Sequence, residues 1–163
     1  MAIKAQSAME YLMTYGWAIL IISVALVSLY ALGLFNPASF AHTSCIFPAD
    51  FSCLNSQLST DGSFVINIEQ STQSPINVTA IGCNSNDSAT HMVSFVSNQI
   101  YLQIGSNVSI SGNSTTLLQC WDNGTVVNAK PGSLFNGYVI VNYTNVETGF
   151  PHTVSAIIIQ KVT

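Results

Sequence analysis

Four cysteines are the residues of this chain that can form covalent bonds with one another. Cys45, Cys53, Cys83 and Cys120 all follow a long apolar segment, and their even number predicts a disulfide framework in an oxidising compartment. Three pairings are possible. We favour Cys45 with Cys53, because this pair brackets a short Phe-Pro loop, and Cys83 with Cys120, which would join two predicted strand ends. No Cys-x-x-Cys pair occurs, so the spacing argues against a zinc site.

Six asparagines begin Asn-x-Ser/Thr triplets, which accept N-linked sugars in exported proteins. Four of them lie in or beside predicted turns and are the stronger candidates. The other two lie in predicted strands, where an outward polar residue needs no sugar to explain it. Glycans would also solvate a surface that carries few charges. The turn group is Asn86, Asn107, Asn113 and Asn123, and the strand group is Asn77 and Asn142.

The remaining polar residues form no catalytic pattern. His42, His91 and His152 are scattered, with no spacing that would place two of them on one metal ion. No phosphate loop, nucleophile elbow or dinucleotide fingerprint occurs. The chain has no arginine and a net charge of −4, so it has no basic surface for nucleic acid. We therefore expect no enzyme activity, cofactor, metal or nucleic-acid partner.

Two different regions must position these residues, and the first is an uncharged segment at residues 12–35. As a helix with a rise of 1.5 Å per residue it would be about 36 Å long, enough to cross a hydrocarbon layer of about 30 Å. Lys4 precedes it, so the positive-inside rule keeps the N-terminus in the cytoplasm and places the rest outside. The pair Asn36-Pro37 predicts the end of the helix. We expect a single-pass membrane protein.

The second region begins after residue 36, where the composition turns to Ser, Thr, Asn, Gly and β-branched residues. This composition and the turn pairs Asp61-Gly62, Asn123-Gly124 and Asn136-Gly137 predict short antiparallel strands. The expected fold class is α+β, with a long N-terminal hydrophobic α-helix followed by an antiparallel β-sandwich-like head, or a partly closed barrel, with disulfides. Strands are predicted at residues 63–69, 76–82, 92–96, 99–104, 116–121, 124–129, 137–146 and 153–162.

The residues before and inside the apolar segment carry a family resemblance. Residues 4–20, KAQSAMEYLMTYGWAIL, are similar to the amino-terminal segment of archaeal type IV pilin-like proteins with a class III signal peptide. The resemblance implies that a prepilin peptidase cuts after Lys4-Ala5 and before Gln6. Gly is commonest before the cut in that family, and Ala5 is also small. The resemblance thus divides the chain into a leader at 1–5, a membrane and filament-core helix at 6–36 and an extracellular head at 37–163.

Glu10 is the one acid at the start of the apolar segment. Cleavage before Gln6 would create a new α-amine, and Glu10 would lie one helical turn from it. An uncompensated carboxylate in hydrocarbon costs at least about 2.5 kcal/mol. The resemblance implies that the amine of an adjacent subunit is its partner, so that Gln6 and Glu10 together select the register of assembly. The alternative is a Glu10 that rests in the headgroup region, where a helix N-terminus favours negative charge.

The function that the resemblance implies is structural. The chain would be a pilin, held in the membrane, trimmed by the peptidase, polymerised by pilus assembly machinery through its helix, and used in adhesion as an extracellular filament. Residues 137–144 and 151–154 also resemble the closing hairpin of pilin heads. Two alternatives remain: a membrane-anchored surface glycoprotein that does not polymerise, and a secreted binding protein or hydrolase cut before His42, after the small-x-small site at residues 39–41.

Overall fold

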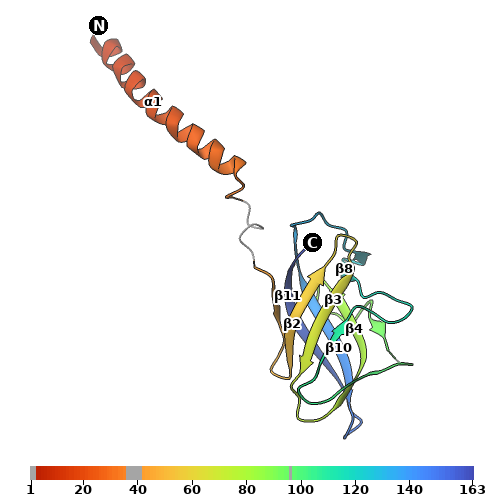
Figure 1. The fold of residues 1–163 in the computed structure, drawn as a ribbon. Coiled ribbons are helices and arrows are strands. Elements are labelled where there is room, and N and C mark those ends of the chain that lie inside the picture. The colour runs from red at the N-terminus through yellow and green to blue at the C-terminus, as the bar shows by residue number, and fades with distance from the viewer. Residues whose placement is uncertain (1–2, 36–41, 96) are drawn as a thin grey trace. The chain divides into compact units, whose positions relative to one another are not determined.

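The computed structural model describes residues 3–35, 42–95 and 97–163, and in the N-terminal helix it describes the side chains of residues 9–11 and 13–31. The chain divides into two compact units, Met1–Phe40 and Ala41–Thr163. Figure 1 shows a single helix in the first and strands in the second, which we call the β unit. The small-x-small site at 39–41 lies outside the described residues.

Helix α1 spans Ile3–Ala31 and ends in a turn centred on Gly33. Gly33 has a φ of +71°, a left-handed conformation that glycine adopts without strain. Leu34 N–H donates to Leu29 O at 3.3 Å, the longer-range bond of a Schellman motif. The predicted continuation of the helix to Asn36-Pro37 is therefore wrong, because the glycine ends the helix first.

Two sheets make up the β unit. The larger sheet has the order β1-β11-β10-β4-β8-β9, with β5 and β6 also paired to β4, and the smaller has the order β2-β3-β7. The pairs are antiparallel except β4 with β8, which is parallel. The strands are β1 Ser44–Ile46, β2 Phe51–Leu58, β3 Phe64–Gln70, β4 Ile76–Asn84, β5 Val93–Ser94, β6 Ile100–Leu102, β7 Asn107–Ile110, β8 Cys120–Asp122, β9 Thr125–Val126, β10 Leu134–Asn145 and β11 Pro151–Lys161.

Each of the eight predicted segments overlaps a strand, whereas β1, β2 and β7 were not predicted. One predicted turn is wrong, because Asn136-Gly137 lies inside β10, opposite Ile159 and Ile158 of β11. A glycine is needed there for a different reason: a Cβ on Gly137 would lie 2.5 Å from Asn84 O. The last two predicted strands form the expected hairpin, β10 with β11.

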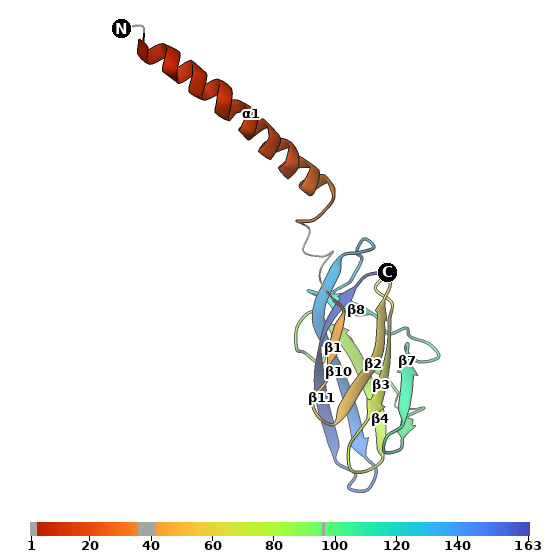
Figure 2. The ribbon, with the colours of Figure 1, turned by 60° about the vertical axis from the view of Figure 1, so that its left-hand side comes forward.

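One hydrophobic cluster holds the β unit together, and it contains side chains from both sheets. Ile66 and Ile68 of β3 are 0% exposed, as are Val78 and Ile81 of β4. Each such buried side chain contributes roughly 1.5–3 kcal/mol to stability. Figure 2 shows the smaller sheet lying along one side of the larger one. The structure thus has an N-terminal apolar helix and a sheet-dominated, mostly antiparallel unit.

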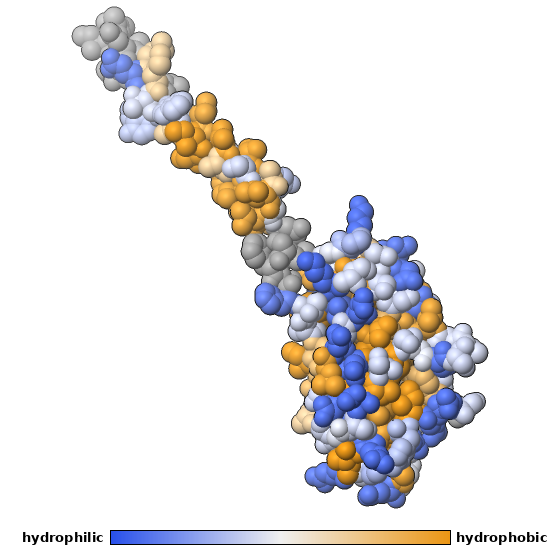
Figure 3. Space-filling model, in the orientation of Figure 1, coloured by the Kyte–Doolittle hydropathy of each residue, from blue (hydrophilic) through white to orange (hydrophobic). Residues whose placement is uncertain are grey.

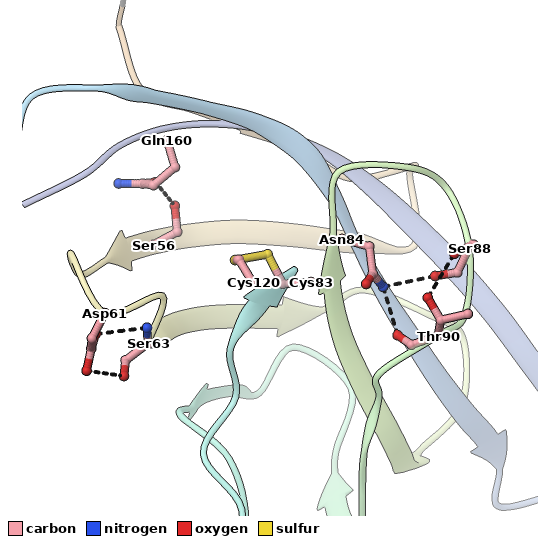
Figure 4. Close-up of a disulfide and its surroundings, with 9 residues drawn as sticks. All are labelled: Ser56, Asp61, Ser63, Cys83, Asn84, Ser88, Thr90, Cys120 and Gln160. Atoms are coloured by element: carbon pink, nitrogen blue, oxygen red, sulfur yellow. Dashed lines mark hydrogen bonds between the residues drawn. A yellow bond between two sulfur atoms is a disulfide. The ribbon is translucent and has the colours of Figure 1, made fainter. Parts of the chain in front are cut away.

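Two disulfides cross-link the β unit in the pairing that the sequence favours. Cys45 bonds to Cys53, with their Cα atoms 5.9 Å apart. Cys83 of β4 bonds to Cys120 of β8, with their Cα atoms 4.5 Å apart (Figure 4). Both members of the second pair are fully buried. The first disulfide joins the two sheets, whereas the second lies within the larger sheet. The hydrogen bond from Ser56 Oγ to Gln160 Oε1, at 2.7 Å, is another link between the sheets.

Candidate assembly helix and modification sites

Helix α1 presents apolar side chains to its surroundings in every direction. From Met9 to Ala31 each described side chain is exposed, and none of this span is buried inside the structure. Figure 3 shows apolar side chains over much of the visible face of the helix. Length and composition make Met9–Ala31 long and apolar enough to cross a membrane. A helix that is apolar all round requires apolar surroundings, either lipid or other helices.

The hydroxyl groups along α1 do not oppose this requirement. Thr14 Oγ1 donates to Glu10 O at 2.9 Å, and Ser23 and Ser28 donate to backbone carbonyls three residues earlier, each at 2.8 Å. Hydroxyls bonded to the helix backbone in this way need no partner outside the helix. The polar atoms of these three residues are therefore compatible with an apolar environment.

Glu10 is the one charged side chain among the described side chains of α1, and it is exposed. Its carboxylate has no ion-pair or hydrogen-bond partner among the described residues, while the neighbouring Tyr11 and Tyr15 rings contact each other with centroids 4.1 Å apart. Gln6 lies in the same helix four residues earlier. The side chains of Lys4, Ala5 and Gln6 lie outside the described side chains, so their roles stay predictions.

Three of the predicted glycosylation sites have exposed asparagines. Asn86 lies in the loop after β4, and its Oδ1 accepts a hydrogen bond from Ser88 Oγ at 3.1 Å. Asn123 lies in the β8–β9 turn with a φ of +48°. Asn107 is also exposed, but it is the first residue of β7, a strand that was not predicted. These three asparagines are open to an enzyme that attaches a glycan.

The other three asparagines are half-buried. Asn113 Nδ2 donates to Ser94 O at 3.0 Å, and its Oδ1 accepts from Thr116 N at 2.6 Å. Asn142 Nδ2 contacts Met92 Sδ at 3.6 Å. Asn77 lies within β4. A glycan on Asn113 or Asn142 would be attached to a nitrogen that already contacts the folded unit, although the sequence places Asn113 among the stronger candidates.

The titratable residues of the β unit make local contacts. No group of three or more His, Cys, Asp or Glu side chains lies together among the described residues. His91 stacks on Trp121 with ring centroids 4.0 Å apart, and His152 stacks on Tyr143 at 5.3 Å. Neither ring contact was predicted, because His91 and Trp121 are far apart in the sequence and the contact of Tyr143 with His152 depends on the exact register of the β10–β11 hairpin.

The surroundings of Asp61 and Tyr143 shift the pKa of each side chain. Hydrogen bonds from Ser63 N and Ser63 Oγ hold the pKa of Asp61 below its usual value, despite full exposure of its carboxylate. This turn was predicted from Asp61-Gly62. Burial, and secondarily the negative charge of Asp50, raise the pKa of Tyr143.

Comparison with protein-family models and with curated proteins found no match. The resemblance to pilin-like proteins therefore depends on residues 4–20 and, less specifically, on residues 137–144 and 151–154.

Proposed function

We propose that this chain is a structural subunit of an archaeal type IV pilus-like filament. A prepilin peptidase removes residues 1–5, and helix α1 passes from the membrane into the filament core. The β unit forms the outer surface, which serves adhesion. The role is structural rather than catalytic.

The observation that carries this proposal is the complete exposure of an apolar helix. Every described side chain from Met9 to Ala31 lacks cover from the chain itself. Lipid covers such a helix before assembly, and packing among identical helices replaces lipid afterwards. A helix that serves only as an anchor needs lipid. Residues 4–20 also carry the sequence pattern of a subunit that leaves the lipid and packs among other helices in a filament.

Glu10 selects the axial alignment of neighbouring helices in the filament. Its carboxylate has no partner among the described residues, and a charge inside hydrocarbon is costly unless it is paired. The α-amine of a neighbouring Gln6 is such a partner. A helix displaced along its axis by one turn would leave both charges unpaired, so correct stacking is favoured over displaced stacking.

The β unit supports the external location. Two disulfides are typical of an oxidising compartment, and exposed Asn86, Asn107 and Asn123 are suited to glycosylation. The hydrophobic cluster shared by both sheets supports a sandwich-like head. Such a head can fold outside the cell without help from the filament.

The amino-terminal residue of the mature protein tests this proposal. Filaments are sheared from cells that produce the chain and are sequenced from their N-terminus by mass spectrometry. We expect Gln6 as the first residue, with the helix retained. An intact Met1 or Ala2 in membranes, with no filaments, would identify an anchored surface protein instead. A soluble product that begins at His42 would identify a secreted protein and would overturn the filament.

A further inference from the structure

Strands β2, β3 and β7 lie side by side in the smaller sheet (Figure 2), and the outer face of this sheet carries mostly polar side chains. Ile66 and Ile68 of β3 lie in the hydrophobic cluster, so the residues that alternate with them face outward. The strand register arranges the outward side chains in rows across the sheet. One row is Ser52, Glu69 and Asn107, and the next row is Asn55, Asn67 and Ser109.

Asn107 lies at one end of this face and starts the triplet Asn107-Val108-Ser109. Its row is the last outward-facing row, because β7 begins at Asn107 and β3 ends one residue after Glu69. The sheet surface therefore continues from Asn107 in one direction only. Diagonal neighbours in an antiparallel pair are about 7–8 Å apart, and Asn67 is the diagonal neighbour of Asn107 in that direction. A sugar attached to Asn107 reaches Asn67 when it lies back on the sheet.

A groove of about 110 Å³ opens on the same face. A β-bulge between Cys53 and Asn55 bends β2 beside it, and bulges of this kind re-aim side chains around sites. Amide and hydroxyl groups can both donate to and accept from the hydroxyls of a neutral sugar. The side chains that line the groove are amides, hydroxyls and one valine: Asn55, Ser56, Gln57, Val65, Asn67 and Ser109.

Asn67 supplies the unused hydrogen-bond acceptor of the groove. Its Oδ1 is buried and makes no hydrogen bond with any described residue. By contrast, Ser56 Oγ already donates to Gln160 Oε1, and the Gln57 side chain donates to Thr163 Oγ1 at 3.3 Å. Turning the Asn67 amide toward the groove breaks no hydrogen bond at Oδ1. A donor in the groove would relieve an unpartnered buried acceptor, which otherwise destabilises the fold.

We propose that an N-linked glycan on Asn107 lies back on the smaller sheet and places a neutral sugar in this groove, where a hydroxyl or N-acetyl N–H group of the sugar donates to Asn67 Oδ1. The sugar is neutral because Glu69 lies directly across from Asn107 and would repel an acidic one. The chain's own glycan is the occupant because its attachment point is next to the groove. Such a tether raises the effective concentration of the sugar far above that of a free saccharide.

This contact would make the glycan a part of the fold as well as a solvating group. Strand β7 has 4 residues and is the edge strand of its sheet. A sugar that is attached to β7 and bonded to Asn67 of β3 links the edge strand to its neighbour. The inference rests on the proposed function, because N-linked glycosylation of Asn107 requires that the β unit be exported.

Mass spectrometry of glycopeptides from the natural protein is the first test. The protein is taken both from sheared filaments and from membranes, so the result does not depend on assembly. We expect a glycan on Asn107. An unmodified Asn107 in both samples would overturn the inference.

A double-mutant cycle between the attachment site and the groove is the second test. Asn67→Leu removes the acceptor, and Asn107→Gln removes the glycan without changing a residue that lines the groove. Asn67→Leu should lower the equilibrium constant for folding about fivefold more in the glycosylated chain than in Asn107→Gln, the equivalent of one hydrogen bond. Denaturant unfolding of the detergent-solubilised full-length chain measures this difference.

Asn86→Gln is the matched control for the loss of a glycan, because Asn86 is exposed in the loop after β4, outside the smaller sheet. In the Asn86→Gln chain, Asn67→Leu should keep its full effect. Amide hydrogen exchange reports the same contact locally. The β7 amides that pair with β3 should exchange about fivefold faster in Asn107→Gln than in Asn86→Gln.

The outcomes separate this inference from the proposed function. Suppose that filament subunits begin at Gln6 but that Asn67→Leu has the same effect with and without the Asn107 glycan. The contact of the sugar with the groove would then be overturned, and the filament would stand. If the mature N-terminus instead identifies an anchored or secreted protein, the proposed function fails. The same cycle on that protein still decides whether the sugar occupies the groove.

Discussion

Isoleucine occupies opposite environments in the two regions of this chain. In α1, Ile21 is 51% exposed, whereas Ile66 of β3 is 0% exposed inside a cluster shared by two sheets. Burial of apolar surface is the main stabilising contribution to a folded domain. The β unit obtains this contribution from its own chain. Helix α1 has to obtain it from lipid or from other copies.

The two regions also treat their polar atoms differently. In the β unit, polar side chains link strands that are distant in sequence, as Ser56 Oγ does when it donates to Gln160 Oε1. In α1, the hydroxyls bond to their own backbone, and the Glu10 carboxylate has no partner among the described residues. Among the described residues the β unit leaves two buried side-chain oxygens without a partner, Asn67 Oδ1 and Gln70 Oε1, while in α1 the unpartnered group is the exposed carboxylate of Glu10.

The largest expected loss of unfolding free energy follows removal of a disulfide, because both disulfides lie in the β unit and restrict its unfolded state. Replacing both Cys83 and Cys120 with Ala should lower its free energy of unfolding by about 4 kcal/mol, since this bond closes a loop of 37 residues. Replacing Cys45 and Cys53, which are 8 residues apart, should cost only about 2.5 kcal/mol. Denaturant unfolding of the detergent-solubilised chain, followed by the β-sheet circular dichroism signal, measures both. Equal losses would show that loop length does not govern the effect.

An identical substitution in each region sharpens the comparison further. Ile66→Ala should lower the free energy of unfolding of the β unit by about 2–4 kcal/mol, because it leaves a cavity in the cluster. Ile21→Ala removes the same atoms from a side chain that the chain does not bury. It should leave the unfolding transition of the β unit unchanged within about 0.5 kcal/mol. A loss in the β unit from Ile21→Ala would mean that the two regions are energetically coupled.

The β unit is predictable from sequence where the spacing of residues follows a simple period. Strand β3 alternates buried residues with exposed or half-buried ones without interruption, and it was predicted for that reason. Strand β2 was missed because a bulge lies between Cys53 and Asn55, which breaks the alternation. The prediction from Asn36-Pro37 places the helix end too late, because Gly33 comes first and its position suits a Schellman turn.

Other features of the structure could not be predicted because they depend on contacts between residues that are distant in the sequence. The pair Asn136-Gly137 predicts a turn, yet Gly137 lies in β10, where Asn84 O approaches too closely for a Cβ. Asn113 matched a sugar acceptor in a turn, but its Nδ2 donates to Ser94 O, nineteen residues away. Each outcome depends on a neighbour that the sequence does not place. For Glu10 no partner lies among the described residues, so an experiment on the assembled protein tests the proposed one.

Glu10→Ala provides that experiment, and its effect should be confined to the first region. Export and folding of the β unit should be unchanged, while incorporation into filaments should fall about tenfold, equivalent to about 1.4 kcal/mol per subunit. Thr14→Ala is the matched control, because Thr14 lies one turn away and its hydroxyl bonds only to the helix backbone. Filament recovery from sheared cells measures both variants. Normal recovery with Glu10→Ala would remove the assembly role of the carboxylate.

The smallest expected effect is on the pH dependence of stability, and it tests the burial of Tyr143 inside the β unit. Tyr143 is 8% exposed, and burial, followed by the charge of Asp50, raises its pKa. The folded state therefore holds the phenolic proton more tightly than the unfolded state does. The resulting stability is fully present below the unfolded value of about 10 and is lost as the pH rises through the higher folded value. Tyr143→Phe should make the decline of unfolding free energy above pH 10 shallower than in the natural protein.

The exposed Tyr101 supplies the control for this change, since Tyr101→Phe also removes one hydroxyl from the β unit but at a position that is 51% exposed. Denaturant unfolding between pH 8 and about pH 11 compares the three proteins, and the slope with pH is the measured quantity. Tyr101→Phe should keep the natural slope. If Tyr143→Phe also kept it, the phenol would titrate alike in the folded and unfolded states. Water would then reach the aromatic cluster of Phe51, Tyr143 and His152 as it reaches the rings along α1. In that cluster, the β unit would not differ from α1 in the burial of its side chains.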